Sequence, residues 1–334
     1  MNTTAATLLF LTAVKLMAAP YHAVGKIQIG GDGGWDYATM DADARRLYVS
    51  HGTHVVVLDP DAGKVVGDIP DTPGVHGIAI AAKLNLGYTS NGRANSVTIF
   101  DLKTLKAIGQ VKVGQNPDAI WYDAASNRIF TFNGRSNDAT VIDAASNQVV
   151  STIPLGGKPE FPAADGNGKI YVNIEDTHEI AEIDMAKGSV TRRYTLTGCE
   201  EPSGLAMDTK KRRLFSVCGN KVMVVSTPDS SKVVATLPIG ESADGAGFDA
   251  GTGLAFSSNG DGTLTVVHEV SGKFEVMETV KTQRGARTMA VDSKTHKIYL
   301  PTAEFGPAPA PTAQQPRPRP SAVPGSFMLL VVGQ

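Results

Sequence analysis

The chain has 334 residues and nearly balanced charge, with 31 Lys and Arg against 33 Asp and Glu and a formal net charge of −2. This balance argues against nucleic acid as a partner, because proteins that bind phosphate backbones carry a basic excess or a basic face. No apolar run reaches the roughly 18 residues of a membrane-spanning helix. The 35 Gly and 19 Pro residues instead favour many short strands joined by turns.

Residues 1–19 are expected to be a signal peptide, because an apolar stretch ends there in Met17-Ala18-Ala19. Three features oppose this interpretation: no Lys or Arg precedes the stretch, Lys15 lies inside it, and Pro20 disfavours cleavage after Ala19. The segment nevertheless lies outside the repeat pattern described next. We therefore expect residues 20–334 to form one domain that is periplasmic or secreted.

An aromatic position recurs about every 42 residues along the chain, which is the period of four-stranded propeller blades. Its members are Tyr48, Tyr88, Phe130, Tyr171, Phe215, Phe256 and Tyr299. The third copy predicts strands at residues 119–122, 128–132, 139–143 and 148–154, called A to D, separated by turns rich in Asn, Asp, Ser and Gly. Each copy therefore predicts one antiparallel blade.

The two ends of the repeat array predict how the ring closes. Residues 22–29 are typical of a strand D without its A, B and C, and residues 327–332 of a strand C without its D. Pairing them completes the last blade and removes the exposed edges of an open array. The predicted fold is all-β: a monomeric seven-bladed β-propeller, with four antiparallel strands per blade and the last blade closed by the N-terminal strand.

The repeat also resembles a known family. Leu47-Tyr48-Val49-Ser50, Ile170-Tyr171-Val172-Asn173 and the later VVSTIPLG at residues 149–156 resemble the YVTN-repeat propellers, which are also called YncE-like proteins. The resemblance covers residues 21–334. It implies the propeller fold and an exported binding or scaffold protein, but it names no chemistry.

The mouth of the central channel is the expected functional site. D–A loops converge there in propellers, and one polar position of the repeat varies in residue type from blade to blade. Its members, here called the polar ring, are Asp36, His76, Asp118, Glu160, Ser203, Asp244 and Arg287. Two interpretations stay open: a solvated channel mouth, or a site for a small ligand, glycan or protein partner.

A divalent cation is a further interpretation of the same position. Asp36, His76, Asp118, Glu160 and Asp244 offer the oxygen ligands that calcium or magnesium prefers, and the imidazole adds a transition-metal ligand. Four carboxylates at one mouth are also expected to repel one another and to raise at least one pKa. The alternative function is therefore a divalent-metal-dependent hydrolase, lactonase or lyase, with a carboxylate or His76 as the base.

The B–C loops should share the face of the polar ring. Arg93 and Arg135 follow Asn-Gly turns in neighbouring blades, and Asn259 begins the matching turn of the sixth copy. These side chains either contact a ligand, with the arginines as clamps for an anion or as stabilisers of developing negative charge, or are ordinary turn residues. Trp35, next to Asp36, is expected to stack on a sugar or to plug the channel.

Two local features complete the expectations. Residues 302–326 form a proline-rich loop inserted in the last blade, which is a lid, a tether for a partner or a disordered insertion. Cys199 and Cys218 should lie at the same end of one hairpin, so a disulfide is predicted in an oxidising compartment.

The sequence contains none of the standard catalytic motifs, although propeller enzymes assemble their sites from scattered loops. The preferred hypothesis is therefore an exported binding propeller rather than an enzyme, with a small molecule, glycan or protein as its partner. No cofactor is required by this hypothesis beyond the divalent cation considered above.

Overall fold

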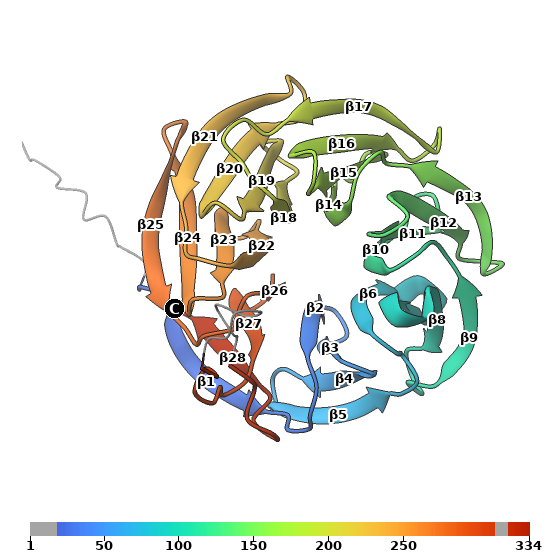
Figure 1. The fold of residues 1–334 in the computed structure, drawn as a ribbon, viewed down its shortest axis with the longest axis horizontal. Coiled ribbons are helices and arrows are strands. Elements are labelled where there is room, and N and C mark those ends of the chain that lie inside the picture. Colours follow the sequence, from blue (N-terminus) through green and yellow to red (C-terminus); the bar gives the residue numbers. More distant parts are fainter. Residues whose placement is uncertain (1–18, 311–319) are drawn as a thin grey trace, which may run out of the picture.

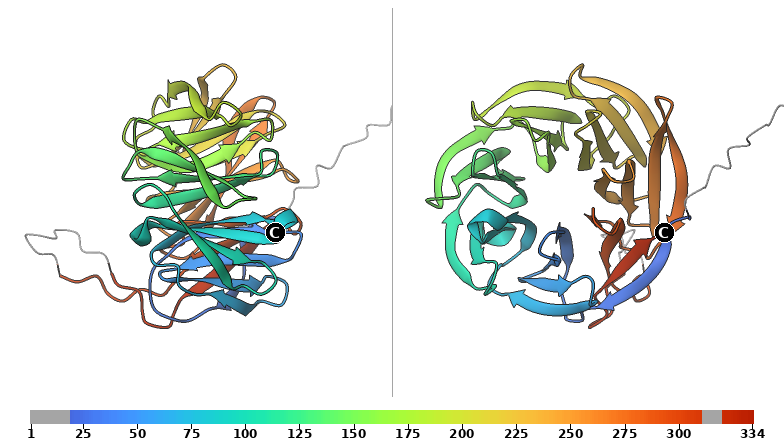
Figure 2. Two further views of the ribbon diagram at one scale, coloured as in Figure 1. Left: turned by 90° about the vertical axis from the view of Figure 1, so that its right-hand side faces the viewer. Right: turned by 180° about the vertical axis from the view of Figure 1, so that it is seen from behind.

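The computed structural model describes residues 19–310 and 320–334. Seven four-stranded antiparallel sheets stand around a central channel, with the first strand of each blade innermost (Figure 1). Figure 2 shows the same ring from the edge and from behind. The fold is a seven-bladed β-propeller, as the repeat predicts.

The blades are numbered from the first complete sheet. Blades 1 to 3 consist of β2 (Trp35–Asp41), β3 (Arg46–His51), β4 (His54–Asp59) and β5 (Lys64–Ile69); β6 (Val75–Ala81), β7 (Leu86–Asn91), β8 (Ser96–Asp101) and β9 (Ala107–Lys112); and β10 (Pro117–Asp123), β11 (Arg128–Asn133), β12 (Asp138–Asp143) and β13 (Gln148–Pro154). Blades 4 to 6 consist of β14 (Pro159–Ala164), β15 (Lys169–Ile174), β16 (Glu179–Asp184) and β17 (Ser189–Thr195); β18 (Pro202–Asp208), β19 (Arg213–Cys218), β20 (Val222–Thr227) and β21 (Lys232–Pro238); and β22 (Ala243–Asp249), β23 (Leu254–Asn259), β24 (Thr263–Val270) and β25 (Lys273–Lys281).

Blade 7 joins the two ends of the described chain. Its strands β26 (Ala290–Asp292), β27 (Lys297–Thr302) and β28 (Met328–Gly333) are completed by β1 (His22–Gln28) as the outermost strand. The register of β1 against β28 runs from His22 opposite Gly333 to Gln28 opposite Met328. The predicted closure is therefore confirmed, and the strands expected in the third copy match blade 3 to within a residue or two.

The core lies between the blades and is built from the repeated aromatic position. All seven aromatic markers are buried in β3, β7, β11, β15, β19, β23 and β27, each at the centre of its sheet. The outermost strand of each blade has few buried side chains. In β13, for example, Val149 and Val150 are both substantially exposed. Burial is thus concentrated on the three inner strands of each blade, which fixes the geometry of the channel wall.

The innermost strands share an irregularity at the end that carries the polar ring. In β2 the register moves from Trp35 opposite His51 to Ala38 opposite Val49, so one extra residue is inserted between them. The same bulge occurs in β6, β10, β14 and β18, and a shorter form occurs in β22. Bulges turn side chains away from strict alternation and are common beside functional sites. Here they allow two successive residues to face the channel.

Cys199 and Cys218 form the predicted disulfide, with their Cα atoms 5.5 Å apart. It links the loop before β18 to the end of β19. In the last blade, the described parts of the proline-rich loop extend beyond one face of the ring (Figure 2), and Phe305 and Ala322 form an isolated antiparallel bridge across its base. Residues 311–319 of this loop lie outside the described residues, as does the predicted signal peptide except for Ala19.

In the part of the chain that the structure describes, no helix has the length and apolarity needed to cross a membrane.

Candidate functional site

The polar ring occupies one structural position around the channel. In blades 1 to 6 its member is the second residue of the innermost strand, within the bulge, and Arg287 of blade 7 precedes β26 by a few residues. Six members are half-buried or buried and Arg287 is exposed. The ring residues were expected in the D–A loops. Six of them lie instead at the beginning of the innermost strands, where the bulge changes the direction of the side chain.

Five members form a continuous arc of alternating charge. His76 Nδ1 lies 2.6 Å from Asp36 Oδ2 and 3.7 Å from Asp118 Oδ1, and Arg287 lies 3.6 Å from Asp36 Oδ1 and pairs closely with Asp244. The arc therefore runs Asp244, Arg287, Asp36, His76, Asp118 through blades 6, 7, 1, 2 and 3. Each cationic side chain bridges two carboxylates from neighbouring blades.

The remaining two members differ from the arc. Glu160 of blade 4 is buried, with Oε1 2.9 Å from Lys158 Nζ, and the same ammonium also pairs with Glu175. Ser203 of blade 5 donates a hydrogen bond to the Ala243 carbonyl at 3.3 Å. The ring therefore has a charged arc, an acid pair held by Lys158, and one neutral hydroxyl.

Burial and mutual repulsion raise the carboxyl pKa values in the ring. Burial, together with the charge of Asp36, raises the pKa of Asp118 to about 6. Burial likewise raises the pKa of Asp244 to about 6, although Arg287 opposes the shift. The pKa of Glu160 rises further, to about 9, through burial, the charge of Asp118 and a hydrogen bond to Glu175. Burial thus favours the neutral form of Glu160, which can donate a hydrogen bond.

The pKa of His76 is raised even though burial of its imidazole opposes the shift. Burial alone lowers the pKa of the imidazole, but the hydrogen bond to Asp36 and the charges of Asp118 and Asp36 outweigh it, so the net pKa is raised. The protonated ring is the form that bridges the two carboxylates. A metal ion at these ligands would have to displace that proton.

Asp36, His76 and Asp118 also satisfy a simple geometric test for metal binding. One ligand atom from each lies within 4.8 Å of the other two. Two carboxylates and an imidazole suit a divalent transition metal better than calcium, which prefers oxygen ligands alone. Glu160 and Asp244, which pair with Lys158 and Arg287, do not join this cluster among the described residues.

Tyr37, next to Asp36, crosses the channel below the ring. Its aromatic ring stacks on Phe161 of blade 4 with centroids 4.4 Å apart. Burial and the nearby charges of Asp118, Asp36, Glu160 and Asp244 raise the pKa of its hydroxyl well above the usual range. The prediction that Trp35 plugs the channel is therefore wrong. Trp35 instead stacks on Phe327 of the last blade, 5.2 Å between centroids.

Among the described residues, no ion pair or hydrogen bond joins the side chains of the predicted B–C loop residues to the ring. Asn259 is fully buried, and its amide donates to Thr263 at 3.0 Å and Thr265 at 3.1 Å, so it holds the blade together rather than offering a ligand contact. Within the described residues, Arg93 and Arg135 form no ion pair; Arg93 packs beside Gly74, and the Arg135 backbone bonds to Gln115. The role of these two arginines as an anion clamp stays a prediction.

Sequence reasoning missed Lys158 and Tyr37. Lys158 stands two residues before the ring position, and Tyr37 one residue after it. Both residues therefore lie outside the repeat position that defines the ring. A scan of the adjacent columns would have found Tyr37 and Phe161 as the two aromatic residues at a position that carries glycine in other blades, such as Gly204, where a Cβ would lie 2.5 Å from backbone atoms of the next blade.

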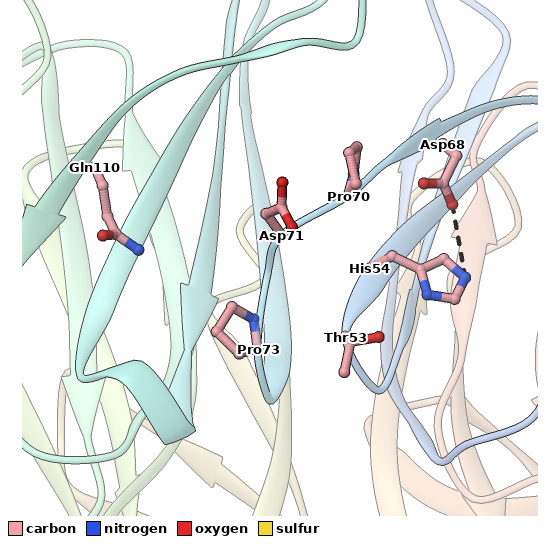
Figure 3. A pocket seen from close by; sticks show the side chains of 7 residues that line it. All are labelled: Thr53, His54, Asp68, Pro70, Asp71, Pro73 and Gln110. Carbon is pink, nitrogen blue, oxygen red and sulfur yellow. Dashed lines mark ion pairs between the residues drawn. The ribbon is translucent and has the colours of Figure 1, made fainter.

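Two cavities flank this arrangement. An open cavity of about 570 Å³ lies at the outer edge between blades 1 and 2 and shares no residue with the ring; His54 Nε2 lies 3.6 Å from Asp68 Oδ2 there (Figure 3). A second cavity of about 510 Å³ lies at the opposite end of the channel, with Tyr37 and Phe161 among its lining residues. The stacked pair therefore stands between the polar ring and this second cavity.

The comparisons with known proteins concern the fold alone. No family model matches the chain, and no curated protein matches it, so the resemblance to the YVTN-repeat propellers stays a prediction. Among solved structures, a chain of the Kuenenia stuttgartiensis hydrazine synthase superposes with a TM-score of 0.71 at 17% identity, over 81% of this chain and 94% of that chain. At that identity the likeness extends to architecture and not to activity. The chain is thus similar in fold to a propeller of hydrazine synthase, and it is itself a seven-bladed β-propeller.

Proposed function

We propose that the protein is an exported propeller that binds a small ligand, a glycan or a protein partner at the channel mouth, through the polar ring. The observation that carries the proposal is the arc of alternating charge, in which five blades each contribute one polar side chain to a continuous network. The Cys199–Cys218 disulfide supports export, because such bonds persist in oxidising compartments.

The chemistry of the ring favours a hydroxyl-rich ligand. The carboxyl oxygens of Asp36, Asp118 and Asp244 can accept hydrogen bonds, while Arg287 and the neutral form of Glu160 can donate them. Sugars present closely spaced hydroxyl groups that donate and accept at once, so they match a site with both kinds of partner. A glycan end group or monosaccharide is therefore the preferred ligand class.

A thermal-shift screen of the full chain at pH 7 against neutral monosaccharides tests this proposal. We expect at least one sugar to raise the Tm by several degrees, because a ligand that binds only the native state stabilises it. The shift should vanish in Asp118→Asn and Asp244→Asn and persist in Asp68→Asn, whose carboxylate lies at the outer edge. A shift that survives both ring variants would place the sugar elsewhere and refute the proposal.

A second candidate function is a divalent-metal-dependent hydrolase, lactonase or lyase, and the cluster of Asp36, His76 and Asp118 favours it. Binding requires that His76 lose the proton it shares with the carboxylates. Metal affinity should therefore rise with pH through the raised pKa of this imidazole. A metal at this place would polarise a substrate carbonyl or activate water, and Arg287 lies close enough to the cluster to face developing negative charge.

Calorimetric titration of Mn²⁺ and Zn²⁺ into the full chain at pH 6 and pH 8 tests the second candidate. We expect one site, tighter at pH 8, that His76→Ala weakens at least about tenfold. Turnover of a lactone substrate should then be lost on chelation and regained on adding the metal. Weak binding that is independent of both pH and His76 would exclude a metal site at the arc.

A further inference from the structure

The cavity at the far end of the channel is built differently from the polar ring. It opens between the A–B turns, because its wall includes Asp41, the last residue of β2, and Asp43, Ala82 and Lys294, which follow the innermost strands of blades 1, 2 and 7. Its volume, about 510 Å³, falls in the range of small-molecule sites. It therefore has the size and the concave shape of a ligand site.

Aromatic side chains form much of this cavity. Tyr37, Trp121, Tyr122 and Phe161 all contribute to its lining, and all four are only partly buried. Phe161 and Tyr37 stack on each other at 4.4 Å, and both Tyr37 and Trp121 pack against the core of blades 3 and 4. Packing on both sides holds these rings in place, so the aromatic surface is formed before any ligand arrives.

The walls carry apolar side chains between the aromatic rings. Met40, Ile78 and Ile80 line the same cavity, and Thr39, the polar side chain among them, already donates to the Ile78 carbonyl at 2.9 Å. Most of the deep surface is therefore apolar, and its unused polar atoms among the described residues are the Tyr37 hydroxyl and the Trp121 ring nitrogen, both at the aromatic side chains. A flat, largely apolar ring fits it better than a sugar does.

The rim of the cavity is acidic. Asp41 and Asp43 contribute two carboxylates, and among the residues that the structure describes Lys294, 2.8 Å from Asp43, is the one cationic side chain of the lining. The side chain of Asp43 is 95% exposed, so its carboxylate keeps room for a second partner. Aromatic faces also carry negative potential that attracts cations. Rim and walls therefore favour a positive charge.

From these features we propose that the far end of the channel is a second binding site, which takes a small aromatic amine with its ring among Trp121, Tyr37 and Phe161 and its ammonium at the Asp41–Asp43 rim. The site is separate from the polar ring, since the stacked Tyr37–Phe161 pair stands between them. It does not depend on what the ring binds. The two ends of one channel thus hold ligands of different chemistry.

Calorimetric titration of the full chain with three indoles of matched shape tests the proposal: tryptamine, indole-3-ethanol and indole-3-propionate. We expect tryptamine to bind at least about threefold more tightly than the alcohol, as a weak ion pair and cation–π contacts would give, and the acid to bind weakest. Trp121→Ala should weaken tryptamine at least about fivefold through the lost stacking surface, and Trp121→Phe should restore part of it.

Two further variants separate this site from the ring. The double variant Asp41→Asn, Asp43→Asn should remove the preference for the amine over the alcohol without changing the fold, because both positions stay polar at the surface. Asp118→Asn, on the ring, should leave the tryptamine affinity within about twofold. The proposal fails if the acid binds as tightly as the amine, if none of the indoles binds at about 10 mM, or if Asp118→Asn rather than Trp121→Ala abolishes binding.

Discussion

Replacing Asp118 with Asn should make the protein more stable at neutral pH. Asp118 is a carboxyl group whose side chain is 17% exposed, and burial raises its pKa from 3.8 to about 6. The folded protein therefore holds this proton more tightly than the unfolded chain does. The neutral carboxyl contributes its full stability below pH 3.8, loses it as the pH rises towards 6, and contributes nothing further above that pH.

The size of the effect follows from the shift. A rise of about two pKa units corresponds to about 3 kcal/mol between the two protonation states. Asn keeps the size of the side chain but carries no charge at any pH. The difference in free energy of unfolding between variant and wild type should therefore be near zero at pH 4 and approach about 3 kcal/mol in favour of the variant at pH 7.5.

Urea unfolding of both proteins from pH 4 to pH 8, in buffer with a chelator, measures this difference. The slope against urea should be the same in both, so that the midpoints report stability. Asp68→Asn, at a carboxylate that is 49% exposed, is the matched control and should stay within about 0.5 kcal/mol at every pH. A variant that is less stable than wild type at pH 7.5, or equally so across the range, would refute the reasoning.

Three other changes test the fold and the channel. Tyr37→Phe removes a buried hydroxyl that has no hydrogen-bond partner, so the free energy of unfolding should stay equal or rise by up to about 1 kcal/mol, and a loss above 1 kcal/mol in urea unfolding would reveal a partner. Replacing Cys199 and Cys218 together by Ala should cost about 3 kcal/mol, because the bond closes a loop with a sequence separation of 19, and reduction of the wild type should match it. Deleting residues 1–29 removes β1 and exposes β28, so we expect association on size-exclusion chromatography; a monomer that melts within a few degrees of wild type would show that closure is dispensable.

Much of the fold could be predicted because the sequence contains seven copies of the same strand pattern. An aromatic residue at the same place in each copy, such as Tyr48 and Tyr299, fixes the second strand, and the turns fix its neighbours. The incomplete copies at the two ends predicted the shared last blade. Comparison of the seven copies shows which positions the packing constrains, since each copy must meet the same packing requirement.

The candidate site was less predictable, because the spacing of the repeat locates a residue on its strand but does not show where its side chain points. The polar ring was found from spacing, yet the pairing of His76 with Asp36 and Asp118 depends on bulges that leave no residue signature. Trp35 and Tyr37 are two residues apart, and only the bulge decides which of them faces the channel. For Asn259 the Asn-Gly turn is predicted correctly, but the side chain donates a hydrogen bond within its own blade.

The charged arc crosses the junction where the ring closes. Arg287 belongs to blade 7 and Asp36 to blade 1, and Thr288 donates a hydrogen bond to the Asp36 carbonyl at the same junction. A propeller that has not closed there lacks a complete arc, so the proposed binding at the arc requires ring closure. By linkage, any ligand that engages both halves of the arc must hold the junction shut, and loosening of the junction must release that ligand.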